Sequence, residues 1–169
     1  MPEPIKHTQS RGVIETVLRK IPGFKGYLEK EYRRDSDALQ REWLAERLAR
    51  SKRGLDDLAR SLTDAGNLDV LPLCERVRAR LDKLIGRIRG GMQGYSGFFD
   101  LVQVDEARLD RVYQHDVAIM DNVEESAEAI ENLPRSSDHP EEALQAVLTQ
   151  LGELDDSWDN RVDLLKGLE

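Results

Sequence analysis

Apolar side chains recur at alternating spacings of three and four residues through most of the chain, and this periodicity limits the possible folds more than any other feature. The clearest stripe consists of Cys74, Val77, Leu81, Leu84 and Ile88. Such spacing places apolar residues on one side of an α-helix, as at the seam between nearly parallel or antiparallel helices. No segment shows the strict alternation of a half-buried strand. The sequence therefore predicts an all-α protein.

The composition favours long helices with broad polar faces. Of the 169 residues, 34% are charged and only 5% are aromatic, which is unlike an average globular domain. A chain of this length buries enough surface to fold as one domain without a metal or a disulfide. We expect a flexible N-terminus over residues 1–10 and a single helical domain over residues 11–169.

Turn-forming and capping residues divide the domain into five predicted helices. Stop signals lie at residues 22–23, 65–67 and 134, and Asp69, Asp105 and Pro140 suit helix starts. The predicted helices cover about residues 12–21, 27–64, 70–90 or beyond, 105–133 and 140–167. Because short connections favour antiparallel neighbours, we expect an elongated up-down-up-down four-helix bundle preceded by a short extra helix.

The net charge of −8 conceals an uneven division of charge. Residues 1–99 contain 20 Lys and Arg against 14 Asp and Glu, a net charge of +6, whereas residues 100–169 contain 5 against 19, a net charge of −14. The acidic half keeps a helical apolar periodicity, which free acidic tails lack. We therefore expect it to pack against the basic half, so that much of the asymmetry is neutralised inside the molecule.

No motif in the sequence predicts catalysis or metal binding. Cys74 is the only cysteine, which excludes an intramolecular disulfide and a thiolate zinc cluster. None of the three histidines lies three residues after a glutamate, so the ExxH pairs of di-iron bundles are absent. The glycines of residues 90–97 follow the negative end of a predicted helix, where a phosphate is not favoured. We expect no cofactor, no metal and no enzymatic activity.

The apolar runs are too short for membrane insertion. The first twelve residues contain no apolar core of a signal peptide, and no run approaches the roughly 18 apolar residues of a transmembrane helix. From the sequence we expect a soluble, cytoplasmic protein.

A glycine–aromatic pattern occurs twice, at residues 23–27 (GFKGY) and 94–98 (GYSGF). In the predicted topology, the start of the second helix and the end of the third lie at the same end of the bundle, so the two pentads should be close. One interpretation is a packing joint, in which glycines allow close approach and the rings fill the space. The other is that exposed rings form a contact patch for a protein partner or a lipid surface.

Basic and aromatic residues are interleaved over residues 19–34, beside the first pentad. This combination suits anionic lipid headgroups or single-stranded nucleic acid. Glu29 and Glu31 interrupt the basic run, and the acidic total disfavours nucleic acid. The residues that we predict to contact a partner or a lipid are Phe24, Lys25, Tyr27, Lys30, Arg33, Arg34, Tyr95, Phe98 and Phe99.

Residues 29–41 offer few apolar side chains for burial. The apolar residues in or beside this stretch are Leu28, Tyr32, Ala38 and Leu39. Either the short first helix covers this part of the second helix, or the polar stretch stands out from the bundle and is offered to a second subunit.

Asp116 is a carboxylate on the apolar seam of the predicted helix 105–133. A buried carboxylate is costly unless it is paired, so we expect a structural ion pair that fixes the register of the helices. The third helix offers the expected partners, which are Arg76, Arg78, Arg80, Arg87 and Arg89.

The sequence thus supports three hypotheses for function. The leading one is a non-enzymatic helical interaction module, an adaptor or scaffold that presents the glycine–aromatic end of the bundle to a protein partner or to a second copy. The alternative is a peripheral protein that binds anionic membrane through the same segment. The third, an enzyme or a small-ligand carrier that uses the bundle interior, lacks any recognisable polar constellation.

Overall fold

The computed structural model describes residues 4–91, 97–136 and 138–167, and this part of the chain contains helices and no strands. The prediction of an all-α protein is therefore confirmed. The α-helices are α1 (Pro4–Lys20), α2 (Lys30–Asp64), α3 (Leu71–Gly90), α4 (Gly97–Asp100), α5 (Glu106–Glu131) and α6 (Pro140–Lys166). Two 3₁₀ turns, η1 (Leu68–Val70) and η2 (Leu133–Ser136), connect long helices.

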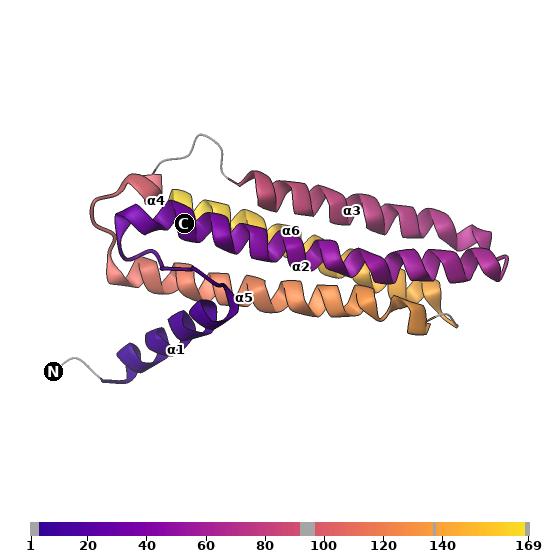
Figure 1. Cartoon of the computed structure of the whole chain (residues 1–169), viewed down its shortest axis with the longest axis horizontal. Coiled ribbons are helices and arrows are strands. Elements are labelled where there is room, and N and C mark those ends of the chain that lie inside the picture. The colour runs from indigo at the N-terminus through magenta and orange to yellow at the C-terminus, as the bar shows by residue number, and fades with distance from the viewer. Residues whose placement is uncertain (1–3, 92–96, 137, 168–169) are drawn as a thin grey trace.

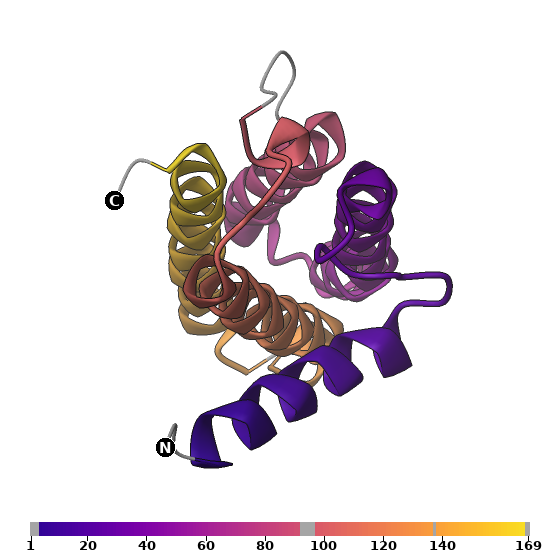
Figure 2. The ribbon, with the colours of Figure 1, turned by 90° about the vertical axis from the view of Figure 1, so that its left-hand side faces the viewer.

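Four long helices lie side by side along the length of the molecule (Figure 1). The end-on view in Figure 2 shows them surrounding a common centre. Helix α2 packs against α3 and α5, and α6 packs against the same two helices. Helix α1 crosses the outside of α5 and diverges from the four long helices toward its N-terminal end.

Residues at the helix ends explain where several helices begin and stop. Asp105 is extended, and its side chain accepts a hydrogen bond from the backbone N–H of Arg108 at 2.7 Å, which caps α5 as predicted. Helix α6 begins at Pro140, whose missing N–H is harmless in a first turn. It ends before Gly167, which adopts a left-handed φ of 74°.

The predicted starts of α1 and α3 are wrong. Helix α1 begins at Pro4, so residues 4–10, which the sequence predicts to be flexible, are helical. The predicted start near Gly12 was chosen because the apolar periodicity begins there. Lysine, glutamine and arginine, however, favour a helix even where apolar periodicity is absent. The N-cap position of α3 is Val70 instead of Asp69, which lies within the turn η1.

The segment before α2, residues 21–29, is not helical and is called the linker below. The sequence predicts a helix from about residue 27, whereas α2 begins at Lys30. Gly23 and Gly26 have positive φ values of 82° and 86°, which a right-handed helix does not contain. The backbone is therefore not helical between α1 and α2. A Cβ atom on Gly26 would lie 2.6 Å from the Tyr113 hydroxyl, so the linker closely approaches α5 here.

The core runs along the centre of the long helices, and its α2 contribution includes Leu44, Leu48, Leu55 and Leu58. Within the described residues, no helix combines the length and the apolar character needed to cross a lipid bilayer.

Candidate functional site

Five segments meet at one end of the molecule: the linker, the first turns of α2, the short helix α4, the start of α5 and the end of α6. Tyr27 lies at the centre of the aromatic packing. Its ring centroid is 5.4 Å from that of Phe24, 5.8 Å from that of Phe98 and 5.2 Å from that of Tyr113. The linker therefore packs against α4 and α5 through these rings. Gly94, Tyr95 and Ser96 of the second pentad lie outside the described residues.

The predicted contact rings are inside the protein. Phe24, Tyr27, Phe98 and Phe99 are all buried, with at most 6% of their surface exposed. Edge-to-face packing of Phe98 on Phe99, with centroids 5.7 Å apart, fills the space between α4 and its neighbours. These four rings are thus a packing joint, and the interpretation of them as an exposed contact patch is wrong. Tyr95 lies outside the described residues.

The first turns of α2 have their polar side inside and their apolar side outside. Arg33, Ser36, Asp37 and Gln40 are buried, each with 5% or less of its surface exposed. In contrast, Leu39 is 37% exposed and Ala38 is exposed as well, as is Leu28 (74%) at the end of the linker. Leu28, Ala38 and Leu39 therefore lie on the outer side of this end of the molecule.

Two of the buried polar side chains of α2 join three buried polar side chains from other elements in a hydrogen-bonded network. This network is called the polar core and consists of Tyr27, Asp37, Gln40, Asp116 and Arg161. Arg161 Nε donates to Asp116 Oδ1 at 2.8 Å. Its Nη2 donates to Asp37 Oδ1 at 2.8 Å and to Gln40 Oε1 at 2.7 Å. The Tyr27 hydroxyl donates to Asp116 Oδ2 at 2.6 Å. The polar core thus joins the linker, α2, α5 and α6.

The charges of the polar core are balanced by one further arginine. Arg41 Nε donates to Asp37 Oδ2 at 2.8 Å, and its Nη1 donates to the carbonyl oxygen of Arg89 at 2.7 Å. Two guanidinium groups therefore face two carboxylates. Both Asp116 oxygens have partners, which is the condition under which a buried ion pair is tolerated.

The structure corrects the predicted partner of Asp116, which is Arg161 of α6 and not an arginine of α3. Helix α5 packs against α2 and α6. Four arginines of α3 instead face acidic residues of α2 or α6, namely Arg78, Arg80, Arg87 and Arg89. Arg78 pairs with Asp56 of α2, and Arg87 pairs with Asp155 of α6. The Arg87–Asp155 pair joins the basic half to the acidic half, so the uneven charge of the two halves is partly neutralised between helices.

Arg33, predicted as a contact residue, is also buried, with 1% of its surface exposed. Its Nε donates to the Tyr27 carbonyl oxygen at 2.7 Å. Its Nη1 donates to the carbonyl oxygens of Leu101 at 2.6 Å and Phe98 at 3.2 Å, and its Nη2 to that of Leu28 at 3.4 Å. Arg33 therefore ties the linker to α4 and the loop after it.

Burial and neighbouring charges fix the ionisation of the polar core. Burial raises the pKa of the Tyr27 phenol well above its ordinary value, and the Asp116 carboxylate raises it further. Burial works against a charged Arg161, but Asp116 and Asp37 raise its pKa overall. Burial also raises the pKa of Tyr113, whose hydroxyl accepts a bond from the Tyr27 backbone N–H at 2.7 Å. A neutral phenol and a charged guanidinium near neutral pH suit a structural network.

Sequence reasoning missed Arg161, Asp37 and Gln40 as members of this network. A signal for them was present in the spacing. Reading the α2 stripe backwards from Leu44 by four, three and four residues gives Gln40, Asp37 and Arg33. Arg161 likewise lies three residues after the buried Trp158. A charged residue in register with an apolar seam is thus the pattern that marks a buried ionic network.

The outer face of this end contains a hollow of about 720 Å³ between α2 and α4, called the α2–α4 hollow. It is lined by Leu28, Glu29, Lys30, Glu31, Arg34, Phe99, Asp100 and Val102. Val102 is 81% exposed, and with Leu28 it forms an apolar edge of the hollow. Arg34 and Asp100 form a salt bridge of 3.0 Å that connects α2 with α4.

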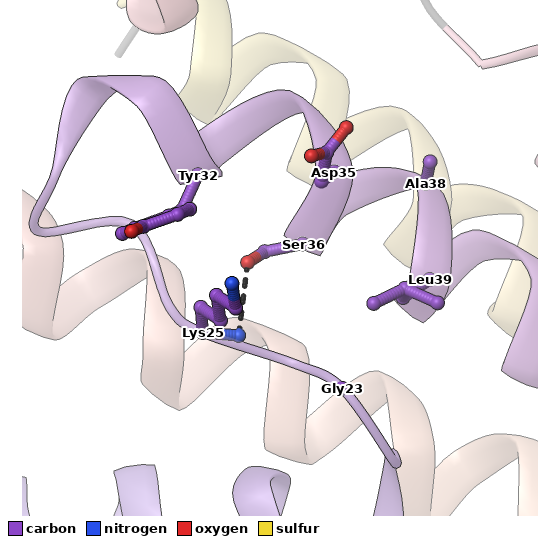
Figure 3. A pocket seen from close by; sticks show the side chains of 7 residues that line it. All are labelled: Gly23, Lys25, Tyr32, Asp35, Ser36, Ala38 and Leu39. Carbon is purple, nitrogen blue, oxygen red and sulfur yellow. Dashed lines mark hydrogen bonds between the residues drawn. The ribbon is translucent and has the colours of Figure 1, made fainter.

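A second hollow, of about 450 Å³, lies between the linker and α2 and is called the linker hollow (Figure 3). Its lining residues are Gly23, Lys25, Tyr32, Asp35, Ser36, Ala38 and Leu39. The backbone N–H of Lys25 donates to Ser36 Oγ at 3.2 Å, which holds the linker against α2. The ammonium group of Lys25 lies 4.5 Å from the centre of the Tyr32 ring. The hollow combines apolar walls with one cation and one carboxylate.

Of the four predicted cationic contact residues, Lys25, Lys30 and Arg34 are exposed, whereas Arg33 is buried. Arg34 lies over the Phe99 ring at 5.2 Å as well as beside Asp100. Glu29, Glu31 and Asp100 lie among these cations around the α2–α4 hollow. The outer face therefore presents both signs of charge together with apolar side chains.

In the described part of the chain, no group of three or more His, Cys, Asp or Glu residues is placed to hold a metal ion. Comparisons with protein-family models, curated proteins and solved structures found no match to this chain. The function proposed below therefore rests on the chain's own residues.

Proposed function

We propose that the chain is an up-down-up-down four-helix bundle with an extra N-terminal helix, and that it works as a non-enzymatic interaction module, an adaptor or scaffold. The contact surface for a protein partner is the outer face of the end described above. It comprises the α2–α4 hollow, the linker hollow and the apolar side chains beside them.

The observation that carries this proposal is the reversed orientation of the first turns of α2. Leu39 of α2 and Leu28 at the end of the linker are exposed, while arginine, aspartate and glutamine side chains of α2 are buried. Grouped exposed apolar residues that are surrounded by polar ones are typical of protein contact sites. The polar core and Arg33 hold this outer face in one conformation, which lowers the conformational entropy lost on binding.

Binding to anionic membrane is the second candidate, and the exposed Leu28 and Val102 beside Lys30 and Arg34 are what favour it. Two observations make it the weaker one. The guanidinium of Arg33 is occupied by backbone carbonyl groups. Glu29, Glu31 and Asp100 would face the same anionic surface. Flotation with phosphatidylserine vesicles tests this candidate, since salt-sensitive binding that is lost in a Lys25→Glu/Lys30→Glu/Arg34→Glu variant would support it.

Site-specific photo-crosslinking in the cells that make the protein tests the leading proposal. A photo-reactive amino acid replaces Val102 in one variant and Leu68 in a matched control. Leu68 is also an exposed apolar residue, at 56%, but it lies in η1 at the opposite end of α2. We expect protein adducts from position 102 that disappear when Leu28→Ser and Leu39→Ser are added. Equal labelling from both positions, or no protein adduct from position 102, would contradict the proposal.

A further inference from the structure

The outer face of this bundle end carries both an apolar projection and an apolar recess. Leu28 and Val102 project from it with 74% and 81% of their surfaces exposed. Between them the α2–α4 hollow is lined by the buried ring of Phe99, of which 6% is exposed. In a two-fold contact, a residue that lies away from the axis meets a different residue of the other copy. A surface that contains both a projection and a recess can therefore fill its own recess from a second copy.

The charges around the hollow are also complementary to themselves. Glu29 and Glu31 lie beside Lys30, while Arg34 and Asp100 already neutralise each other across a 3.0 Å salt bridge. A partner surface with a single sign of charge would be repelled by part of this face. A two-fold contact can instead place Lys30 of each copy opposite Glu29 and Glu31 of the other.

Arg33 holds the backbone of both projecting segments in place. Its guanidinium donates to the carbonyl oxygen of Leu28 at 3.4 Å and to that of Leu101, the residue before Val102, at 2.6 Å. Because this anchor is buried, the two projections keep their spacing before any partner arrives. Such preorganisation reduces the entropic cost of association.

We propose that the occupant of the α2–α4 hollow is a second copy of this chain, docked by two-fold symmetry through Leu28, Val102 and the charges of residues 29–31. This inference rests on the proposed function, because it assumes that the outer face is a protein contact. The two copies bury Leu28 and Val102 in each other's hollows, and Lys30 of each copy faces the glutamates of the other.

Sedimentation of the purified full-length chain over a range of concentrations tests the inference. We expect a monomer–dimer equilibrium that weakens at least about tenfold in dissociation constant for Val102→Asp and for Leu28→Asp. The control Leu68→Asp places the same charge on an exposed leucine at the opposite end of α2 and should leave the equilibrium unchanged. A wild-type chain that stays monomeric, or a dimer that both variants retain, would overturn the inference.

Charge reversal gives a second test that does not depend on apolar burial. Lys30→Glu makes residues 29–31 wholly acidic, and Glu29→Lys/Glu31→Lys makes them wholly basic. Each variant alone should dimerise at least about tenfold more weakly than the wild type, because like charges then face each other. An equal mixture of the two should form a mixed dimer. Failure of the mixture to associate, with both variants folded by circular dichroism, would overturn the two-fold arrangement.

The crosslinking experiment separates failure of this inference from failure of the proposed function. A purified chain that is monomeric, together with adducts to a different protein from position 102, would leave the outer face as an interaction site and overturn the second-copy assignment. The absence of any position-102 adduct would overturn both. Adducts of twice the chain mass, lost in Leu28→Asp, would support both.

Discussion

Arg161 connects three helices at the end of the molecule that contains the polar core. From α6 it donates to Asp116 of α5 and to Asp37 and Gln40 of α2, and only 1% of its surface is exposed. Removing one partner of a buried ion pair leaves an uncompensated charge, which costs about 3–5 kcal/mol. We therefore predict that Arg161→Met lowers the free energy of unfolding by that amount, measured by urea unfolding monitored by circular dichroism.

An exposed arginine provides the control for this measurement. Arg60 of α2 lies 3.8 Å from Asp57, with 74% of its side chain exposed, so Arg60→Met should change the free energy of unfolding by no more than about 0.5 kcal/mol. Asp116→Leu should also destabilise the protein. If that variant unfolded as cooperatively as the wild type and with equal or greater stability, the polar core would not serve to fix the helix register.

His115, beside Asp116 in α5, predicts a pH dependence of stability. Burial lowers the pKa of His115 below its ordinary value of 6.5, and its buried Nδ1 has no hydrogen-bond partner among the described residues. Between the lowered pKa and 6.5, the unfolded chain binds more protons than the folded chain, so stability falls as the pH decreases below 6.5.

We predict that the free energy of unfolding of the wild type decreases between about pH 7 and about pH 5.5, and that His115→Gln reduces this decrease. Urea unfolding at several pH values measures it. His139→Gln, at the exposed N-cap position of α6, is the matched control and should retain the wild-type profile. An identical slope for His115→Gln and the wild type would contradict a role for His115.

At the scale of elements, Gly54 allows α2 to lie against the end of α5. A Cβ atom at this position would overlap the carbonyl oxygen of Ile130 and lie 2.6 Å from the Cα atom of Glu131. Alanine is intrinsically more favourable in a helix than glycine by about 1 kcal/mol, but rigid backbone cannot move aside as a side chain can. We predict that Gly54→Ala lowers the free energy of unfolding by about 1–3 kcal/mol.

Gly86 of α3 is the matched control, because a Cβ atom there meets nothing within 4 Å. Gly86→Ala should therefore stabilise the protein by up to about 1 kcal/mol through helix propensity alone. Thermal unfolding of both variants measures the difference. If Gly54→Ala were stabilised as much as Gly86→Ala, the close approach of α2 and α5 would be disproved.

The helices themselves were largely predictable because each depends on local spacing and caps. The positions of α5 and α6 follow from their apolar stripes, the Asp105 cap and Pro140. The start of α2 was not predictable in this way, because it is set by the close approach of Gly26 to Tyr113, 87 positions away in the chain. The short helix α4 was missed for a similar reason, since its Phe98 is held by contacts with Tyr27 and Arg33.

The partner of Asp116 required knowledge of which helices are neighbours. Spacing indicated that Asp116 lies on a seam, but five arginines of α3 were equally acceptable partners on charge alone. The choice of Arg161 depends on α6 packing beside α5, a long-range relation that periodicity does not encode. The outward-facing apolar side of α2 could have been found, because the spacing of its buried leucines extends to Gln40, Asp37 and Arg33.

At the scale of the whole molecule, the uneven charge distribution becomes an interaction between two halves of the fold. The basic half contains α2 and α3, the acidic half contains α5 and α6, and each long helix of one half packs against a helix of the other. Salt bridges cross between the halves, as in Arg47 with Glu124 and Glu131, and Arg87 with Asp155. The net charges of +6 and −14 should therefore draw the halves together.

This division predicts salt-dependent association of the two halves. If the folded chain is cleaved at a protease site that replaces residues 92–96, the separated halves should reassociate with a rate constant that falls at least about tenfold between about 0.02 M and about 0.3 M NaCl. Stopped-flow fluorescence can follow this reassociation, because Trp43 lies in one half and Trp158 in the other.

Two matched variants separate net charge from direct pairing. Arg87→Gln and Arg60→Gln each remove one positive charge from the basic half, but of the two only Arg87 forms a salt bridge with the acidic half. Both should slow association slightly, and only Arg87→Gln should speed dissociation. A rate of association that is independent of salt would contradict electrostatic attraction between the halves.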